Sequence, residues 1–254
     1  MNSRELKDFL EAKVEQYHQP EFLKDDPICI PHHFERKEDI EISGFLTATI
    51  AWGNRKSIIK SAKRLMELME WEPYRYIMGY HPDHSEALSD FVHRTFNGED
   101  LACFINALKH LYTVYGGLEP IFARYETEHS LQPAIAAFKR HFFEREHPQR
   151  SMKHISDPEK GSAAKRINMF LRWMIRDNSR GVDFGLWQSL HPSQLSCPLD
   201  VHSGRVARKL GLLKRTQSDA KAVAELDMNL RKLDPADPVK YDFALFGLGV
   251  FEKF

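Results

Sequence analysis

Residues 161–176 read GSAAKRINMFLRWMIR and have the period of a helix that is buried along one side. Five apolar residues fall on one helical face: Ile167, Phe170, Leu171, Met174 and Ile175. Lys165 lies in the first turn, on another face that it shares with Met169, Arg172 and Arg176. The segment therefore predicts a helix packed into a core, with a lysine at its start and further cations along the same side.

Lys165 and Asp200 are the two candidate catalytic residues in this part of the chain. Most lysines are solvated on the surface, whereas a neutral amine in a pocket can attack an electrophilic carbon and form a Schiff base. Asp200 precedes a second predicted helix at residues 201–213. It could be only the N-cap of that helix, or a carboxylate kept charged by the helix amides that faces a developing positive charge.

Helical periodicity extends through most of the remaining sequence, and strand patterns are nearly absent. The predicted helices span residues 5–17, 39–52, 56–70, 73–78, 84–95, 100–115, 118–125, 130–145, 162–176, 201–213, 219–233 and 239–251. No linker or internal repeat divides the chain. We therefore predict one all-α domain over residues 1–254.

Amino-acid composition and charge limit the classes of function that the protein can have. The chain has 36 basic and 36 acidic residues, and zero net charge counts against a general nucleic-acid binder. Residues 160–215, however, contain eleven Lys or Arg and only three acidic residues, which indicates a local basic surface. The N-terminus lacks a signal-peptide core and no apolar run is long enough to span a membrane. Three distant cysteines argue against disulfides and a four-cysteine cluster, so we expect a cytoplasmic protein.

Four segments in order resemble the helix-hairpin-helix DNA glycosylases. Gly161, Lys165, Asn168 and Leu171 resemble the second half of the hairpin in endonuclease III-like members, and residues 200–206 (DVHSGRV) resemble the family's D-x-H-x-x-R-V run. FLTATIAWGNRKSIIKSAKRL, from Phe45 to Leu65, is similar to the first barrel helix, the damage-probing loop and the next helix. Residues 234–249, DPADPVKYDFALFGLG, are similar to the closing helix.

The chain also departs from those enzymes. Its hairpin turn reads PEKGSA, and the family's iron–sulfur cysteines are missing. Lys165 and Asp200 are 35 positions apart, a spacing closer to that of archaeal 8-oxoguanine glycosylases. Overall the chain resembles an uncharacterised bacterial group, a domain of unknown function, within this superfamily.

The resemblance implies a fold of two helical subdomains with a central cleft. Subdomain A would be a helical barrel with the hairpin, at about residues 42–172. Subdomain B would combine about residues 1–41 with residues 173–254.

The resemblance also implies a base-excision repair glycosylase, with associated AP-lyase activity, that flips a damaged base such as 8-oxoguanine from double-stranded DNA. Lys165 would attack C1′ of the sugar and Asp200 would stabilise the transition state. The DNA contacts would be Asn54, Lys160, Arg166, Arg172, Arg208 and Lys209. The base pocket would comprise Trp52, Met169, Asp242 and Phe246. Gly161, Asn168, His202 and Arg205 would support the site structurally.

Several of these residues could instead have a purely structural role. Trp52 and Phe246 could be plain core aromatics, Asn54 a turn residue and Asp242 a helix cap. We expect a monomer without metal or cofactor and without a membrane partner. Two rival functions stay open: a DNA-binding member of the same fold that does not cut, and a helical protein-interaction module.

Overall fold

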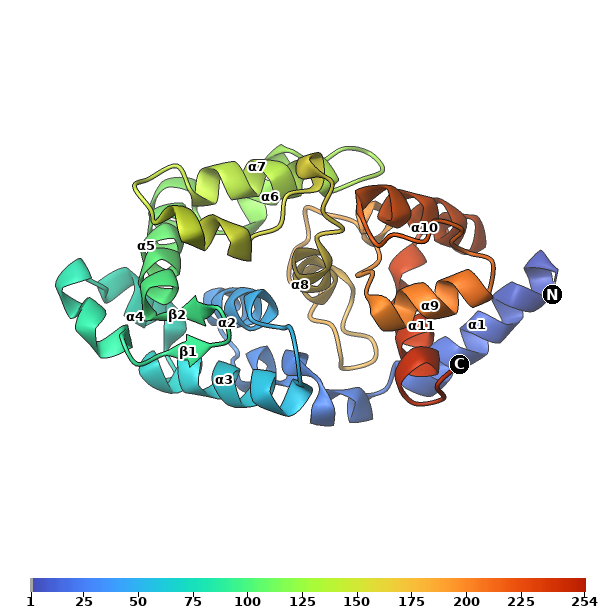
Figure 1. Ribbon diagram of the computed structural model, residues 1–254, viewed down its shortest axis with the longest axis horizontal. Coiled ribbons are helices and arrows are strands. Elements are labelled where there is room, and N and C mark those ends of the chain that lie inside the picture. The colour runs from blue at the N-terminus through green and yellow to red at the C-terminus, as the bar shows by residue number, and fades with distance from the viewer. Residues whose placement is uncertain (1) are drawn as a thin grey trace.

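The computed structural model describes residues 2–254, and these residues are predominantly helical (Figure 1). Their α-helices are α1 (Ser3–Tyr17), α2 (Lys37–Thr49), α3 (Arg55–Leu68), α4 (Pro73–Gly79), α5 (Gly98–Tyr115), α6 (Glu119–Arg124), α7 (Gln132–Phe142), α8 (Lys165–Ile175), α9 (Val201–Lys209), α10 (Ala220–Leu233) and α11 (Tyr241–Val250). Short 3-10 helices connect them: η1 (Pro20–Asp25), η2 (Pro27–Cys29), η3 (Pro31–His33), η4 (Pro82–Leu88), η5 (Gln149–His154), η6 (Pro158–Lys160), η7 (Pro192–Gln194) and η8 (Pro238–Lys240). The prediction of an all-α chain is confirmed.

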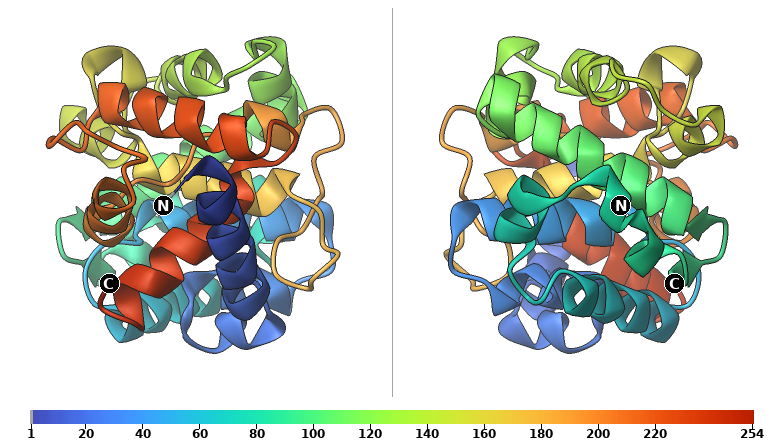
Figure 2. Two further views of the ribbon diagram at one scale, coloured as in Figure 1. Left: turned by 90° about the vertical axis from the view of Figure 1, so that its right-hand side faces the viewer. Right: turned by 90° about the vertical axis from the view of Figure 1, so that its left-hand side faces the viewer.

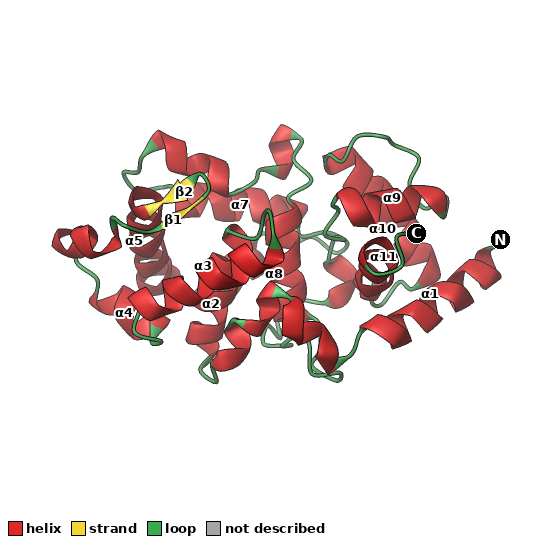
Figure 3. Ribbon diagram, turned by 60° about the horizontal axis from the view of Figure 1, so that its bottom comes forward, coloured by secondary structure: helices red, strands yellow, loops and turns green. Residues whose placement is uncertain are grey.

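The helix predicted at residues 84–95 is wrong. The structure has the 3-10 helix η4 there, followed by the short antiparallel hairpin of β1 (Val92–His93) and β2 (Phe96–Asn97), shown in Figure 3. Arg94 adopts a left-handed backbone conformation (φ 56°), which reverses the chain between the strands. The buried rings of Phe91 and Phe96 meet edge to face below the hairpin, so apolar residues that suggested a helix instead anchor a turn.

Helix α8 lies in the middle of the molecule, and two apolar clusters form on either side of it (Figure 1). The larger cluster joins α2–α8, and the smaller one joins α1, α9, α10 and α11. As expected from the sequence pattern, Ile167, Phe170, Leu171, Met174 and Ile175 of α8 are all buried in the larger cluster. The opposite side of α8, which begins with Lys165, is therefore turned toward the smaller cluster.

The boundaries of the two clusters differ from those proposed for subdomains A and B. Ile28 and Ile30, and the loop from Val182 to Leu195, pack in the larger cluster, although sequence placed both segments in subdomain B. The loop returns along α8, where the N–H groups of Phe184 and Trp187 donate to carbonyls of Trp173 and Met174. Pairing with the backbone of α8 assigns this loop to the larger cluster.

Helix α11 connects the two clusters. Phe243 belongs to the larger cluster, while Tyr241, Leu245 and Leu248 belong to the smaller one. Helices α1 and α9 pack directly on α11, and Figure 2 (left) shows α1 crossing α11. The first and last helices of the chain therefore build one layer together.

Buried ion pairs add a polar connection between α8 and α11. Arg172 on α8 donates to Asp242 on α11 at 2.6 Å and to Asp183 at 3.2 Å. Arg176, one turn later, also pairs with Asp183 and forms a two-pronged contact with Asp237. Both arginines are 4% exposed, so each charge depends on these partners and the network fixes α8 against α11.

Candidate functional site

A pocket of about 1030 Å³ opens between α8, α9, α11 and the start of α3. Its lining includes most of the residues that sequence selected: Trp52, Asn54, Lys165, Arg166, Met169, Arg172, Asp200, His202, Asp242 and Phe246. The other six selected residues do not line it: Lys160, Gly161, Asn168, Arg205, Arg208 and Lys209. Its size suits a ligand as large as a nucleobase with its sugar.

Lys165 and Asp200 meet in this pocket. Lys165 is the first residue of α8 and Asp200 is the N-cap of α9, and Nζ lies 3.1 Å from Oδ2 of the aspartate. The lysine side chain is 34% exposed and that of the aspartate 17%. Residues 35 positions apart in sequence thus form one ion pair that solvent, or a ligand, can reach from the pocket.

The two oxygens of Asp200 have separate partners. Oδ1 accepts the backbone N–H groups of His202 (2.8 Å) and Ser203 (2.9 Å), while Oδ2 faces Lys165. Burial alone would raise the pKa of Asp200, but the Lys165 charge and the helix amides outweigh it, and the pKa is lowered. The N-cap role and the proposed charged role are therefore compatible in the same carboxylate.

A tight turn sets the direction in which Lys165 leaves the backbone. Gly161 has φ 85° and Ala164 has φ 47°, so the chain reverses twice within four residues before α8 begins. Asn168 is buried one turn into α8, where its side chain donates to the Ala163 carbonyl at 3.1 Å. Gln132 of α7 donates in turn to the side-chain oxygen Oδ1 of Asn168 at 2.9 Å. Asn168 thus holds the turn to the helix, consistent with the supporting position that sequence gave it.

The first half of this hairpin differs from a regular helix-hairpin-helix. Only the three-residue 3-10 helix η6 precedes Gly161, in place of an α-helix. Lys160 at its end is exposed and lies outside the pocket lining. The turn is instead tied to α10 by the Ala220 N–H, which donates to the Gly161 carbonyl at 3.0 Å.

Trp52 and Arg166 form one wall of the pocket. The Arg166 guanidinium lies 4.7 Å from the centre of the Trp52 ring and donates to the Thr49 carbonyl at the end of α2. The ring of Trp52 also contacts His93 and His154, so one side of it is held in the protein. Burial lowers the pKa of Arg166 to about 10. Arg166 therefore braces Trp52 in the wall of the pocket, and its contact with DNA stays a prediction.

Two DNA-contact predictions, Arg172 and Arg208, need correction. Arg172 is buried in the ion pairs with Asp183 and Asp242, so it cannot reach a phosphate at the surface. Arg208 donates to the carbonyls of Arg215 and Thr216, and this holds the loop between α9 and α10. Arg172 is therefore used in the buried network, and Arg208 in holding a surface loop.

The remaining predicted contacts lie at the surface. Asn54 is exposed and caps α3, with its side-chain oxygen 3.4 Å from the Ser57 nitrogen. Lys209 is exposed on α9 and lies 5.3 Å from the Phe254 ring. His202 supplies a backbone N–H to Asp200, and Arg205 donates to the Gly249 carbonyl at 2.9 Å, closing the end of α11. His202 and Arg205 therefore support the start of α9 and the end of α11.

The predicted base-pocket residues on α8 and α11 line one side of the pocket. Phe246 is half-buried beneath the guanidinium of Arg55, which lies 4.6 Å from its ring. Met169 is half-buried on the same face of α8 as Lys165. Asp242 is 6% exposed, and burial raises its pKa although Arg172 opposes that change. Asp242 therefore belongs both to the pocket wall and to the buried network.

The sequence did not indicate that the N-terminal segment contributes residues to the pocket. Asp26 caps η2, is buried, and lines the pocket together with Phe22 and Arg55. Burial raises the pKa of Asp26, against the opposing charge of Arg172. Its Oδ1 accepts the Ile28 N–H at 3.1 Å, and no hydrogen bond to Oδ2 occurs in residues 2–254. The Asp-Pro pair at residues 26 and 27 signals a helix start, but nothing local signals burial beside a distant lysine.

The segment that leads to Asp200 rests on another buried carboxylate. Asp227 of α10 is 4% exposed and accepts the Cys197 N–H at 2.9 Å, three residues before Asp200. Burial raises the pKa of Asp227 to about 6, despite this hydrogen bond. Asp227 therefore connects the smaller cluster to the position of the candidate site.

The raised pKa of Asp227 predicts a pH-dependent stability. The folded protein binds the proton of Asp227 more tightly than the unfolded chain does, and this difference stabilises the fold. The stabilisation is complete below about pH 4, the pKa of an aspartate in the unfolded chain, and is lost as the pH rises through about 6, the pKa in the folded protein. Asp227→Asn resembles the protonated form, so its free energy of unfolding should not fall over this pH range. In the wild type the fall should be about 3 kcal/mol at most. Urea unfolding of both proteins between pH 4 and pH 7 measures the difference, which should grow with pH. Parallel stability profiles would contradict the raised pKa.

Among the side chains that the structure describes, no group of three or more His, Cys, Asp or Glu is arranged to hold a metal ion. None of the helices among residues 2–254 is long and apolar enough to cross a membrane.

The model of a family described as "Protein of unknown function (DUF2400)" matches residues 26–251, which is most of the chain. The search of curated proteins and the search of solved structures found no match.

Proposed function

We propose that this chain, which belongs to the DUF2400 family, is a DNA glycosylase with AP-lyase activity that acts on a base flipped out of the duplex. The observation that carries the proposal is the 3.1 Å contact between Lys165 Nζ and Asp200 Oδ2 inside a large pocket. A lysine amine beside a carboxylate, with aromatic rings nearby, is suited to attack on a sugar carbon next to a stacked base. The proposal includes the two-subdomain glycosylase fold with its central cleft.

Binding would begin with extrusion of the base, at a cost of a few kcal/mol. Asn54, exposed on the loop before α3, is our candidate for the residue that fills the gap in the duplex. Phe246 and the free part of Trp52 offer apolar surfaces on which the extruded base can stack. The pocket would then hold the sugar over Lys165.

The proposed reaction begins when Lys165 loses its ammonium proton to water, so that its amine is neutral while Asp200 beside it keeps its negative charge. The amine electron pair forms a bond to C1′ as the glycosidic bond breaks, and the departing base keeps the electron pair of the glycosidic bond and takes up a proton from water. Opening of the C1′–O4′ bond gives an imine between Nζ and C1′, with the proton on O4′. Loss of a C2′ proton then expels the 3′ phosphate, which is the β-elimination of an AP lyase. Water finally hydrolyses the imine and restores the amine.

An oxidised purine such as 8-oxoguanine is the substrate class we propose first. Guanine presents N7 as an acceptor, whereas its 8-oxo form carries a hydrogen on N7. Asp26 and Asp242 place carboxyl oxygens in the pocket wall, and such oxygens can accept a hydrogen bond from that N–H. Normal guanine would leave Oδ2 of Asp26 without this donor, which costs binding energy.

A panel of duplexes that each contain one lesion tests the function. Base release and strand nicking are measured for each lesion, and borohydride is added to reduce any imine to a stable protein–DNA adduct. We expect an adduct and a nick with at least one oxidised purine. Tight duplex binding without base release on any member would favour the rival function of a DNA-binding protein that does not cut.

Salt dependence tests the DNA surface separately. Lys56, Lys160 and Lys209 are exposed cations on α3, η6 and α9, and we expect each to neutralise one phosphate. Each alanine variant should weaken binding to damaged and undamaged duplex alike, and should reduce the slope of log K against log salt by about 0.9. Fluorescence anisotropy over a salt series provides the measurement, with Lys7→Ala on α1 as the control. Unchanged slopes in all three variants would place the DNA surface elsewhere.

A further inference from the structure

Most charged side chains that line the pocket around Lys165 either have a partner in the protein or are exposed to water. The partnered cations form three contacts: Lys165 with Asp200, Arg172 with Asp242, and Arg166 with the Thr49 carbonyl. The exposed group comprises Asp25, Lys56 and His202. Arg55 and Asp26 belong to neither group, so their interactions are left for a ligand in the pocket.

Arg55 is a half-buried cation at the start of α3. Its guanidinium lies 4.6 Å from the centre of the Phe246 ring. Among the side chains that the structure describes, this guanidinium has no hydrogen bond and no ion pair. A cation–π contact at a partly exposed site is weak, so a base that stacks on Phe246 can displace the guanidinium. The N–H donors of Arg55 are therefore available to a base in the pocket.

Asp26 supplies a buried acceptor beside this free donor. It is 8% exposed, and in the described part of the chain its Oδ2 accepts no hydrogen bond. Burial raises the pKa of Asp26, and the charges of Arg172 and Arg55 oppose that change. Since η2 packs on α3, Arg55 is close enough to act on Asp26, yet the two side chains do not form an ion pair. A ligand group with both an acceptor and a donor can therefore contact the two residues together.

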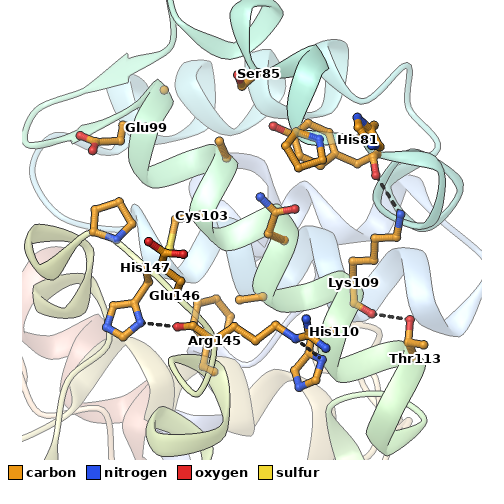
Figure 4. Close-up of a pocket in the computed structure, with 18 of the residues that line it drawn as sticks. His81, Ser85, Glu99, Cys103, Lys109, His110, Thr113, Arg145, Glu146 and His147 are labelled. Atoms are coloured by element: carbon orange, nitrogen blue, oxygen red, sulfur yellow. Dashed lines mark hydrogen bonds between the residues drawn. The ribbon is translucent and has the colours of Figure 1, made fainter.

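The other large hollow of the molecule has a different arrangement of charges. A groove of about 1030 Å³ lies along α5, between η4 and the chain after α7 (Figure 4). Its cations Lys109 and Arg145 donate to the Tyr80 carbonyl at 2.8 Å and to His110 at 2.9 Å. The carboxylates in its lining are all exposed: Glu86, Glu99 and Glu146. Hydrogen bonds are stronger where water is excluded, so the buried acceptor that favours selective recognition lies in the pocket around Lys165.

We propose that Arg55 determines specificity by donating a hydrogen bond to the C8 carbonyl oxygen of an 8-oxopurine, while Asp26 accepts one from the adjacent N7–H. The inference rests on the proposed function and adds a residue that reads the oxidised position itself. Guanine offers neither group, because its C8 carries a hydrogen and its N7 is an acceptor. The free donor and the free acceptor therefore both favour the oxidised base, and each would lose its contact with guanine.

A binding preference tests this role without requiring the chemistry. Two duplexes that differ only in one base, 8-oxoguanine or guanine, are titrated by fluorescence anisotropy with the full chain carrying Lys165→Gln, so that neither duplex is cleaved. This protein should bind the 8-oxoguanine duplex more tightly. Adding Arg55→Met, which can still cover the Phe246 ring but has no N–H donor, should reduce the preference about 10-fold or more. Arg64→Met is the matched control, because Arg64 is exposed on the same helix and lies outside the pocket lining.

Three results would overturn the role of Arg55. One is equal binding of both duplexes before Arg55 is changed, and another is a preference that survives Arg55→Met. The third is equal weakening on both duplexes, which would assign Arg55 to the phosphate backbone. Failure of the proposed function is distinguishable, since the unaltered chain would then neither release 8-oxoguanine nor nick a duplex with an abasic site, whatever the binding preference shows.

Discussion

Replacing Lys165 with glutamine is expected to abolish both the borohydride-trapped adduct and strand nicking on a lesion duplex. Glutamine has nearly the same reach but no electron pair that can attack C1′, so the imine cannot form. Duplex binding should persist within a few-fold, because the exposed cations on α3, η6 and α9 are unchanged. Gel analysis of the trapped complex, together with anisotropy on the same duplex, separates loss of chemistry from loss of binding.

Lys160→Gln is the matched control for this variant. Lys160 lies five residues earlier on the same hairpin, is exposed, and does not line the pocket. Its substitution removes the same charge and should leave the adduct intact while weakening binding slightly. Undiminished cleavage by Lys165→Gln would refute the role of Lys165 as the nucleophile.

The sequence predicted α8 well because a single physical signal dominates that segment. Five apolar residues on one face require burial, and burial of that face leaves Lys165 on the side toward the pocket. The pairing with Asp200 was not predictable in this way, because nothing local relates two residues 35 positions apart. The pairing was expected from the resemblance to the glycosylases, and Lys165 Nζ does lie 3.1 Å from Asp200 Oδ2.

The charge count of residues 160–215 was a poorer guide. It treats every cation as available, whereas Arg172 and Arg176 are buried with aspartates and Arg180 pairs with Glu15 of α1. Arg215 pairs with Asp219, and Arg208 binds backbone carbonyls. Much of the local positive excess is therefore used to hold the fold together. Partners distant in sequence decide this, and a composition window cannot include them.

Other features were missed because they depend on tertiary structure alone. Asp26 lines the pocket only because η2 packs near α2 and α3, and the groove on α5 exists only between η4 and the chain after α7. The hairpin at residues 92–97 depends on one residue, Arg94, in a left-handed conformation that is uncommon outside glycine. Secondary-structure propensities do not predict a left-handed conformation at an arginine.

Asp200→Asn should slow base release by about 10²- to 10³-fold, equivalent to about 3 to 4 kcal/mol of transition-state stabilisation. The asparagine oxygen can still accept the N–H groups of His202 and Ser203, so the start of α9 should be preserved. What disappears is the negative charge that faces Lys165 and the positive sugar as the base departs. Since the pKa of Asp200 is lowered, wild type keeps this charge throughout a neutral assay.

Stability should change far less than the rate, because a partly exposed ion pair contributes only about 0–1 kcal/mol. Asp219→Asn provides the matched control: Asp219 caps α10 as Asp200 caps α9, accepts the Ala222 N–H at 3.0 Å, and lies outside the pocket lining. Single-turnover base release on the duplex cleaved by wild type measures both variants. If Asp219→Asn and Asp200→Asn slowed the reaction equally, capping alone would explain the loss. A large, selective effect of Asp200→Asn would instead identify its carboxylate as the group that stabilises the transition state.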